Sequence, residues 1–503
     1  MLPACPWIAP DLSRTASSHD GRTVGLLDQH LTRSGTMRSK LTPRSPADNG
    51  EATHSLKDDR GWALLRSWLP ADLDAIAHAH GAILRERKIC DGALLVRLAL
   101  LYATCLRSLA VTAAWAARAF ALDVTPDALS YRFRQSVTFL KAITASVLTA
   151  RLRGPSIEGV ALRLIDATSI CGPGAEGTEW RIHLTYDPGQ GAVCGAEITD
   201  EHGGEHLNRA AAEPHDLVIG DRGYGHARDV RAARHAERKC LIRGHLQSLA
   251  ITDLAGVGLT PRRLIDDAQR GHWDRDVMLL QRGFEPEPVR LVIVPLPIEA
   301  ASRARQKLAK AAKKKGRRPD ALAMELAGYL CLLTTLSREH ASVPMLCRWY
   351  RIRWQVELFF KRARQMLHLG QVRGGDDLVQ LQLWAQVLLS ALCEWGASGL
   401  CDAPRVGPNS TPVSLWRAVR IVALELLQAL LGDASLEDHC AKVETTRTRL
   451  RDRPRRRRSY AAATIDEIVE RSGVARRTIF RHFGDLSELQ LAAMRSVMMR
   501  SAP

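Results

Sequence analysis

The spacing of hydrophobic residues changes near position 155 of this 503-residue chain. Over residues 61–153 apolar side chains recur every three or four positions with Arg and Lys between them, which is typical of amphipathic helices. From residue 160 the apolar runs become short and β-rich, and glycine clusters separate them, as expected for adjacent antiparallel strands at 160–170, 180–187 and 192–200. The sequence therefore predicts a helical N-terminal region followed by a core that contains a sheet.

The later segments alternate between strand and helix. An apolar strand at 216–220 ends in a glycine turn, and further strand-like runs lie between 238 and 327 and at 329–336. Helical spacing returns at 343–369, 378–395 and 415–431. This order predicts an α/β fold class.

The charge balance favours a polyanionic partner. Lys and Arg total 71 against 54 Asp and Glu, which gives a formal net charge of +17 and a pI near 9.7. Nucleic acid is the usual partner of such a protein because each neutralised phosphate releases counterions, although a membrane surface also attracts basic proteins. The most apolar stretches, 93–124 and 378–395, are interrupted by Arg, Gln or Glu, which predicts core helices and no membrane span.

Cysteine usage and the N-terminus predict a cytoplasmic protein. Eleven cysteines are spread singly along the chain, without the close pairs that bind zinc or form redox motifs. Such cysteines are expected to be reduced and mostly buried. Pro3, Pro6 and Pro10 interrupt the start of the chain, so no signal peptide is evident.

Two aspartates are expected at the ends of strands. Asp166 follows one apolar run, and Asp221 follows another, immediately before Arg222, Gly223 and Tyr224. Carboxylates at strand ends are held on rigid backbone and face the crevice in which α/β sheets bind ligands. Each aspartate taken alone is explained equally well by a turn or a cap.

Five polar side chains share one face of the helix predicted at 343–369. At about 100° per residue they fall within an arc of about 80°, and apolar residues gather on the opposite side. The five are Tyr350, Arg353, Glu357, Lys361 and Arg364. The alternative is a solvent-exposed face that is stabilised by pairing of Glu357 with Arg353 and Lys361 at four-residue spacing.

These residue types suit phosphoryl transfer. Two or three converging carboxylates bind two Mg²⁺ or Mn²⁺ ions about 3.5–4 Å apart, which activate the attacking oxygen and stabilise the leaving one. Cations beside such a site grip the phosphates of a nucleic acid, and Arg can do so with two parallel hydrogen bonds.

The motifs DRGY at 221–224 and YRIRWQVELFFKRARQML at 350–367 resemble the D-D-E insertion-sequence transposases with a Y-R-E-K signature, the insertion-sequence-four family. GTEWRIHLTYD and GGEHL after the first aspartate are also similar to this group, so the resemblance covers roughly residues 60–455. It implies that Asp166, Asp221 and Glu357 are the catalytic metal ligands. The DNA contacts are then expected at Tyr350, Arg353, Lys361 and Arg364, together with Arg222 and Tyr224. The last signature position, usually Lys, is Arg364 here, which keeps the charge and alters the geometry.

The resemblance also implies a ribonuclease-H-like core with a β-rich insertion between the second aspartate and the glutamate. The glutamate follows Asp221 by 136 positions, too far for a simple connection in a compact core. The expected order is a disordered leader (1–58), a helical DNA-binding domain (59–155), the catalytic domain (156–400) with its insertion (238–327), a helical segment with a basic tail (401–459) and a further fragment (460–503).

Three features of the catalytic region have two interpretations each. Trp273 is expected either to stack on an unpaired base or to belong to the core. The lysine-rich run at 307–318 either follows a DNA backbone or forms a solvated, mobile tip. His183, His202 and His206 lie near the first aspartate, but their spacing favours surface or strand packing over a metal site.

Residues 460–503 resemble the helix-turn-helix of TetR-type repressors. Thr464 and Glu467 form a capping box, Gly473 occupies the turn, and 475–483 would be the recognition helix. Fewer than about 50 residues without the family's first helix bury little core of their own, so we expect a fused fragment of an interrupted regulator gene. The alternative is an added DNA-binding module that uses Arg476, Arg477, Thr478 and Arg481.

The leading hypothesis is a transposase that cleaves and transfers DNA strands at the inverted repeats of an insertion sequence, by attack of water and then of a freed 3′ hydroxyl. Its expected partners are double-stranded DNA, from the element ends and the target, and a second copy of the chain in a synaptic complex. A DNA-binding regulator without catalysis and a catalytically dead remnant are the alternatives. The regulator leaves the two aspartates and the signature helix unexplained.

Overall fold

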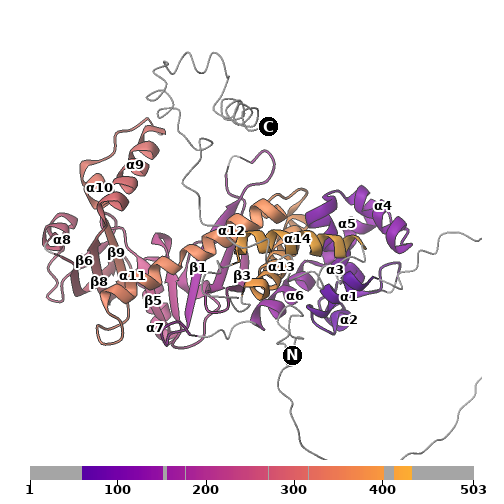
Figure 1. The fold of residues 1–503 in the computed structure, drawn as a ribbon, viewed down its shortest axis with the longest axis horizontal. Helices are drawn as coiled ribbons and strands as arrows, with labels where there is room; N and C mark the ends of the chain where they lie inside the picture. The colour runs from indigo at the N-terminus through magenta and orange to yellow at the C-terminus, as the bar shows by residue number, and fades with distance from the viewer. Residues whose placement is uncertain are drawn as a thin grey trace, which may run out of the picture.

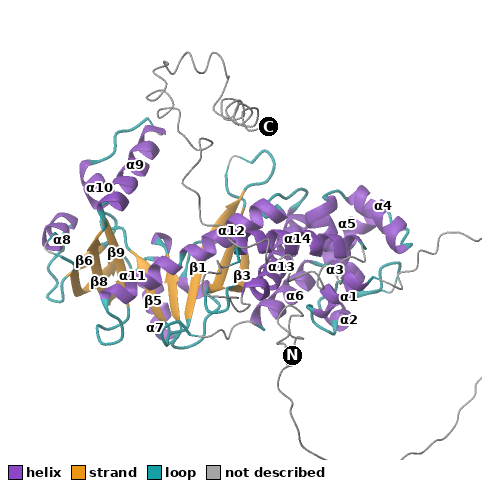
Figure 2. Cartoon of the chain, viewed as in Figure 1, coloured by secondary structure: helices purple, strands orange, loops and turns teal. Residues whose placement is uncertain are grey.

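The computed structural model describes residues 59–432 except 86, 151–155, 176, 270, 315 and 402–412. The expected leader (1–58) and the helix-turn-helix (460–503) lie outside the described residues. Helices gather at one end of the molecule, and the strands extend towards the other (Figures 1 and 2).

The helical pattern predicted for 61–153 is confirmed by a series of helices. Asp91, Ser108 and Thr125 each accept a hydrogen bond from a backbone N–H in the first turn of the helix that follows, which fixes where three of these helices begin. The predicted C-terminal helices are present as well. The helices are α1 (Arg60–Ser67), α2 (Leu73–Ala79), α3 (Gly92–Leu101) with a π-helical turn (Tyr102–Leu106), α4 (Leu109–Phe120), α5 (Pro126–Gln135), α6 (Val137–Thr149), α13 (Asp376–Cys401) and α14 (Leu415–Leu431).

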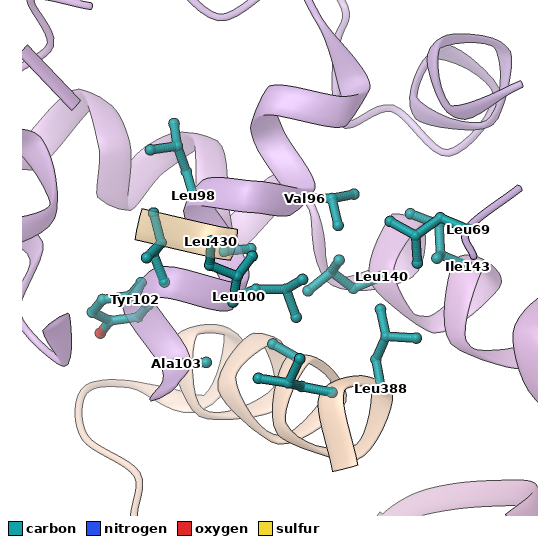
Figure 3. Packing of buried hydrophobic residues seen from close by; sticks show 14 of the residues in the cluster. Leu69, Val96, Leu98, Leu100, Tyr102, Ala103, Leu140, Ile143, Leu388 and Leu430 are labelled. Carbon is teal, nitrogen blue, oxygen red and sulfur yellow. The ribbon is translucent and has the colours of Figure 1, made fainter. Parts of the chain in front are cut away.

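The N-terminal helices share one hydrophobic core with α13 and α14. Leu100 of α3 lies in this core with Leu388 of α13 and Leu430 of α14 (Figure 3). The buried guanidinium of Arg97 donates hydrogen bonds to the main-chain oxygens of Ala429 and Leu430, in the last turn of α14, where helix carbonyls lack regular helical partners. The helix predicted at 415–431 therefore packs as part of the N-terminal helical body.

In the part of the chain that the structure describes, nine strands form one sheet in the order β3-β2-β1-β4-β5-β9-β8-β7-β6. The first three pair antiparallel, β4 runs parallel to β1, and β5 runs parallel to β4. This half of the sheet has the arrangement expected of a ribonuclease-H-like core, and the predicted α/β fold class is confirmed. The strands are β1 (Leu162–Ile170), β2 (Trp180–Asp187), β3 (Ala192–Asp200), β4 (Leu217–Gly220), β5 (Lys239–Arg243), β6 (Ala250–Thr252), β7 (Trp273–Gln281), β8 (Phe284–Pro295) and β9 (Tyr329–Thr334).

Different helices cover the two faces of the sheet. Because side chains alternate along a strand, Leu164 and Ile219 face one core while Ile165 and Val218 face the other. The first core is closed by α11, α12 and α13, and the second by α7 and α8. The bounds of the helices not yet given are α7 (Ala227–His235), α8 (Pro261–Ala268), α11 (Val343–Ile352) and α12 (Trp354–Leu367).

The segment between β5 and β9 extends the main sheet and is less purely β than predicted. β8 pairs antiparallel with β9, and β7 and β6 follow outwards. Most of the lysine-rich run is neither an extended strand nor a loop, because it belongs to α9 (Ile298–Lys314). This helix and α10 (Ala321–Leu326) project from the sheet in Figure 1. Within the described residues, no helix has both the length and the apolar character of a membrane span.

Candidate active site

The structure places Asp166 in the middle of β1, which corrects the prediction that it ends the strand. β1 continues to Ile170 because it stays paired with β2, where Asp166 lies opposite Leu184. Its parallel pairing with β4 stops earlier, at Leu164 and Ile219. Asp166 therefore lies on the part of β1 that is paired with β2 and no longer paired with β4.

Asp221 lies beside Asp166. Each aspartate is two residues beyond the last parallel pair, Leu164 with Ile219, and side chains two residues apart along a strand point to the same face. Asp221 keeps an extended backbone (φ −87°, ψ −161°), so the alternation continues past the end of β4. Neighbouring strands are about 4.8 Å apart, so the two carboxylates are neighbours on the face that α12 covers.

Glu357 joins this pair from α12. The helix predicted at 343–369 is divided, since α11 ends at Ile352 and α12 begins at Trp354, although Arg353 between them keeps helical angles (φ −48°, ψ −28°). The Arg353 guanidinium donates to Glu357 Oε1 and also to Asp166 Oδ2, the latter at 3.4 Å. One arginine thus connects the acid of α12 with the acid of β1.

The three carboxylates influence one another electrostatically. Burial raises the pKa of Asp166 to about 7; Arg353 opposes this shift, and the negative charges of Asp221 and Glu357 reinforce it. The side chains of Asp166 and Arg353 are only 14% and 13% exposed, so water screens these charges poorly. A site of this kind requires positive charge beside the carboxylates.

The donor set suits divalent cations, on the condition that Arg353 moves aside. Carboxylate oxygens are the ligands that Mg²⁺ and Mn²⁺ prefer. As placed, no three Asp, Glu, His or Cys side chains in the described part of the chain lie close enough to hold a metal ion. Arg353 is the counter-ion between Asp166 and Glu357 in this arrangement.

Two further signature cations follow Glu357 along α12. Lys361 is exposed, and its Nζ lies 4.3 Å from the centre of the Trp354 ring. Arg364 is also exposed and donates to Thr168 Oγ1, just beyond Asp166 on β1. Both cations therefore lie on the surface that leads to the acids.

A cavity of about 510 Å³ adjoins the acids on the side of α9 and α10. Asp221 and Tyr350 line it, and the guanidinium carbon of Arg353 lies 5.8 Å from the centre of the Tyr350 ring. Its cationic lining residues are Arg222, Arg243, Lys307 and Arg353. The cations of this lining can bind a phosphodiester, whereas the Asp221 carboxylate would repel it unless a divalent cation lay between them.

Two of the predicted DNA contacts are buried. Tyr224 is fully buried, and its ring lies so close to Gly220 that a Cβ there would be 2.9 Å from it. Trp273 is 7% exposed and belongs to the core on the face opposite α12. In this conformation neither side chain presents a surface to DNA, and the core interpretation of Trp273 fits its position.

The three histidines near the first aspartate contact other groups. His183 is buried in β2 and shares a hydrogen bond with Thr199 on β3. His206 is paired with Asp229 on α7, and the exposed His202 is paired with its neighbour in the chain. These contacts are the strand and surface packing that the sequence favoured.

Glu205 is a further carboxylate at the site that the sequence did not single out. It belongs to the GGEHL motif after β3, and its Oε2 lies 1.6 Å from the position that a Cβ on Gly223 would take. Burial raises the pKa of Glu205, and the charge of Asp221 adds to this shift. The motif was noted for its resemblance, but no spacing in the sequence shows that the turn after β3 folds onto the turn after β4.

Comparison with known proteins points to one family of enzymes. Residues 161–392 match the family model of the transposase DDE domain, a range that contains all three acids. The chain is 32% identical over 335 residues to the putative transposase InsL for insertion sequence element IS186A of Escherichia coli K12. It is also 32% identical over 336 residues to the transposase for insertion sequence element IS421 of Escherichia coli. Each alignment covers 65% of this chain and 90% of the relative.

Two other matches concern the fold and the C-terminus. The piggyBac transposase in a synaptic complex with hairpin DNA aligns with a TM-score of 0.38 and 8% identity, over 84% of this chain and 91% of that one. Residues 456–493 match the tetR family of bacterial regulatory proteins, which confirms the predicted resemblance in a segment outside the described residues. On the strength of the two insertion-sequence relatives, aligned along 90% of their length, the chain belongs to the DDE transposases of insertion sequences.

Proposed function

We propose that this transposase cleaves and rejoins DNA at the terminal inverted repeats of its insertion sequence, with Asp166, Asp221 and Glu357 as the catalytic carboxylates. These side chains would hold two Mg²⁺ ions, with Mn²⁺ as the alternative. The observation that carries the proposal is the position of Asp166 and Asp221 side by side on one face of the sheet, with Arg353 joining Glu357 to Asp166. When bound, the two ions supply activation of the attacking oxygen and stabilisation of the leaving one.

The cations of the site bind the DNA backbone in this proposal. Lys361 and Arg364 contact phosphates from the exposed face of α12, and Arg222 and Lys307 do so from the adjoining cavity. Arg353 neutralises Asp166 and Glu357 in the metal-free protein, and its planar fork is suited to a phosphate once it leaves them.

The attacking groups are water and then a freed 3′ hydroxyl, with no covalent protein–DNA intermediate. Tyr350 lines the cavity together with Asp221, and burial raises its pKa, so it stays protonated near neutral pH and is a poor nucleophile. A stable protein–DNA adduct formed during cleavage would contradict this assignment.

The proposed partners are double-stranded DNA and a second copy of the chain. InsL and the IS421 protein are transposases for insertion sequence elements, and we propose the same class of substrate here. Transposition joins two element ends to one target, which calls for a synaptic complex of two chains. The proposed place of action is the nucleoid, in the bacterial cytoplasm.

Cleavage of a duplex that carries the element's own ends tests the proposal. The variants Asp166→Asn, Asp221→Asn and Glu357→Gln are expected to lose at least about 1,000-fold in Mg²⁺-dependent cleavage, since each removes an essential charge. They should still shift the duplex in a gel, because the surface cations are unchanged. Glu339→Gln, an exposed acid before α11, is the matched control and should cleave normally.

The results of this test distinguish the transposase from the alternative functions. Cleavage that survives in the three variants would overturn the assignment of the acids. Binding without cleavage in the unmodified protein would favour a DNA-binding regulator or an inactive remnant.

A further inference from the structure

Glu205 lies against the turn that carries Asp221. From the position of a Cβ on Gly223, Glu205 Oε2 is 1.6 Å away and Asp221 Oδ1 is 3.4 Å away, so the two carboxylate oxygens are separated by no more than these two distances together. The absence of a side chain at Gly223 leaves the space that the Glu205 carboxylate occupies. The DRGY turn and the GGEHL turn thus bring two acids to one place.

The Glu205 carboxylate forms no ion pair, and the nearby charge of Arg181 only partly offsets the effect of burial and of Asp221 on its pKa. Among the described residues it takes part in no hydrogen bond or ion pair, although it is half-buried. Other acids nearby are paired, since Glu197 bonds Arg209 and Asp229 bonds His206. A poorly hydrated carboxylate without a partner is costly, and this cost indicates that a cation is missing from its surroundings.

Tyr224 gives an independent indication from below the carboxylates. Its side chain is fully buried, and its hydroxyl has no hydrogen-bond partner among the described residues. The carboxylates of Glu205, Asp166 and Asp221 all lie near enough to this hydroxyl to raise its pKa. A buried donor left unpaired beside three strong acceptors indicates that these acids are arranged around something other than the phenol.

We infer that Glu205 is a fourth metal-binding carboxylate, which holds one of the two proposed divalent ions together with Asp221. The inference rests on the proposed function and adds a residue that the D-D-E pattern does not contain. Hard divalent cations take several oxygen ligands, and the number of charged ligands sets their affinity. Glu205 supplies one more such oxygen on the side of Asp221 where Arg353 provides no counter-charge.

Binding of Mn²⁺ to the full-length protein, without DNA, tests the inference by electron paramagnetic resonance. Two Mn²⁺ ions per chain are expected for the unmodified protein. Glu205→Gln should weaken one of them at least about tenfold. Glu201→Gln is the matched control, because this acid lies in the same turn, is 51% exposed and should leave both ions unchanged.

A second variant displaces the Glu205 carboxylate without changing its charge. In Gly223→Ala the new methyl group takes the space of Glu205 Oε2, so the same ion should be weakened. Thermal unfolding in EDTA identifies any variant that fails to fold, and Glu205→Gln is expected to unfold no earlier than the unmodified protein because it loses an unpaired buried charge.

Two negative outcomes have different meanings. Unchanged Mn²⁺ binding in Glu205→Gln, combined with loss of binding in Asp166→Asn and Asp221→Asn, would overturn this inference and leave the proposed function intact. Unchanged binding in all three variants would overturn the proposed metal site itself.

Discussion

Replacing Asp166 by Asn is expected to stabilise the metal-free protein at pH 8. Burial raises the pKa of this carboxyl from 3.8 to about 7, so the folded state holds a proton that the unfolded state has already lost between those two values. Stability therefore falls as the pH rises from about 4 to 7 and stays lower above that range. This difference in pKa lowers the free energy of unfolding at pH 8 by about 4 kcal/mol, relative to a side chain that stays neutral.

The attraction between Asp166 and Arg353 is already part of this figure. The pKa of about 7 includes the effect of Arg353 across the 3.4 Å contact, so no separate cost is subtracted for the lost ion pair. The expectation is a free energy of unfolding that is higher by up to about 4 kcal/mol at pH 8 and not higher at pH 4. Arg353 still contacts Glu357 in the variant.

Urea unfolding in EDTA, followed by tryptophan fluorescence at pH 8 and pH 4, measures this difference. Asp267→Asn on the exposed part of α8 is the control and should change the unfolding free energy by less than about 0.5 kcal/mol at either pH. Added Mg²⁺ should stabilise the unmodified protein and have no such effect on Asp166→Asn. A variant that is less stable than the unmodified protein at pH 8 would refute the electrostatic argument.

Three further outcomes can be measured. Arg362 and Glu394 form a buried ion pair between α12 and α13, so Arg362→Ala should lower the free energy of unfolding, measured in urea, by about 3–5 kcal/mol. The double variant Arg362→Met with Glu394→Leu should regain most of the lost stability. Lys361→Ala should reduce the slope of log affinity against log salt by about 0.9 in DNA-binding titrations, and an unchanged slope would remove Lys361 from the phosphate contacts. A protein that ends at Tyr460 should bind and cleave element ends as the full chain does, and loss of either activity would show that the TetR-like segment is an added DNA-binding module.

The strands of the core could be predicted closely from the sequence. Short β-rich runs and the glycine clusters between them predicted the antiparallel strands β2 and β3 at their observed bounds. They also predicted the end of β1 at Ile170, whereas the expectation that Asp166 ends a strand was wrong because pairing with β2 continues past it. Helices α9 and α10 were not predicted because this segment was interpreted from its positive charge and from the strand-like runs that precede it.

The candidate site was predictable in its motifs and not in its contacts. Helical spacing predicted that Arg353 and Glu357 share a face, and the structure pairs them. The contact of Arg353 with Asp166, 187 positions away, depends on how α12 crosses β1, and no local pattern encodes this. Glu205 could not be predicted for the same reason, because its contact with Gly223 brings together the turn after β3 and the turn after β4.

The place of β9 between β5 and β8 has a consequence for attempts to shorten this protein. Removing β6, β7 and β8 would leave one side of β9 with a row of unsatisfied backbone amides and carbonyls. An exposed edge strand of this kind pairs with strands of other molecules. The shortened protein should therefore self-associate unless charged residues or proline are introduced on the edge. The outer strands therefore keep the edge of β9 paired, and β9 leads through α11 to α12, the helix of the proposed catalytic Glu357.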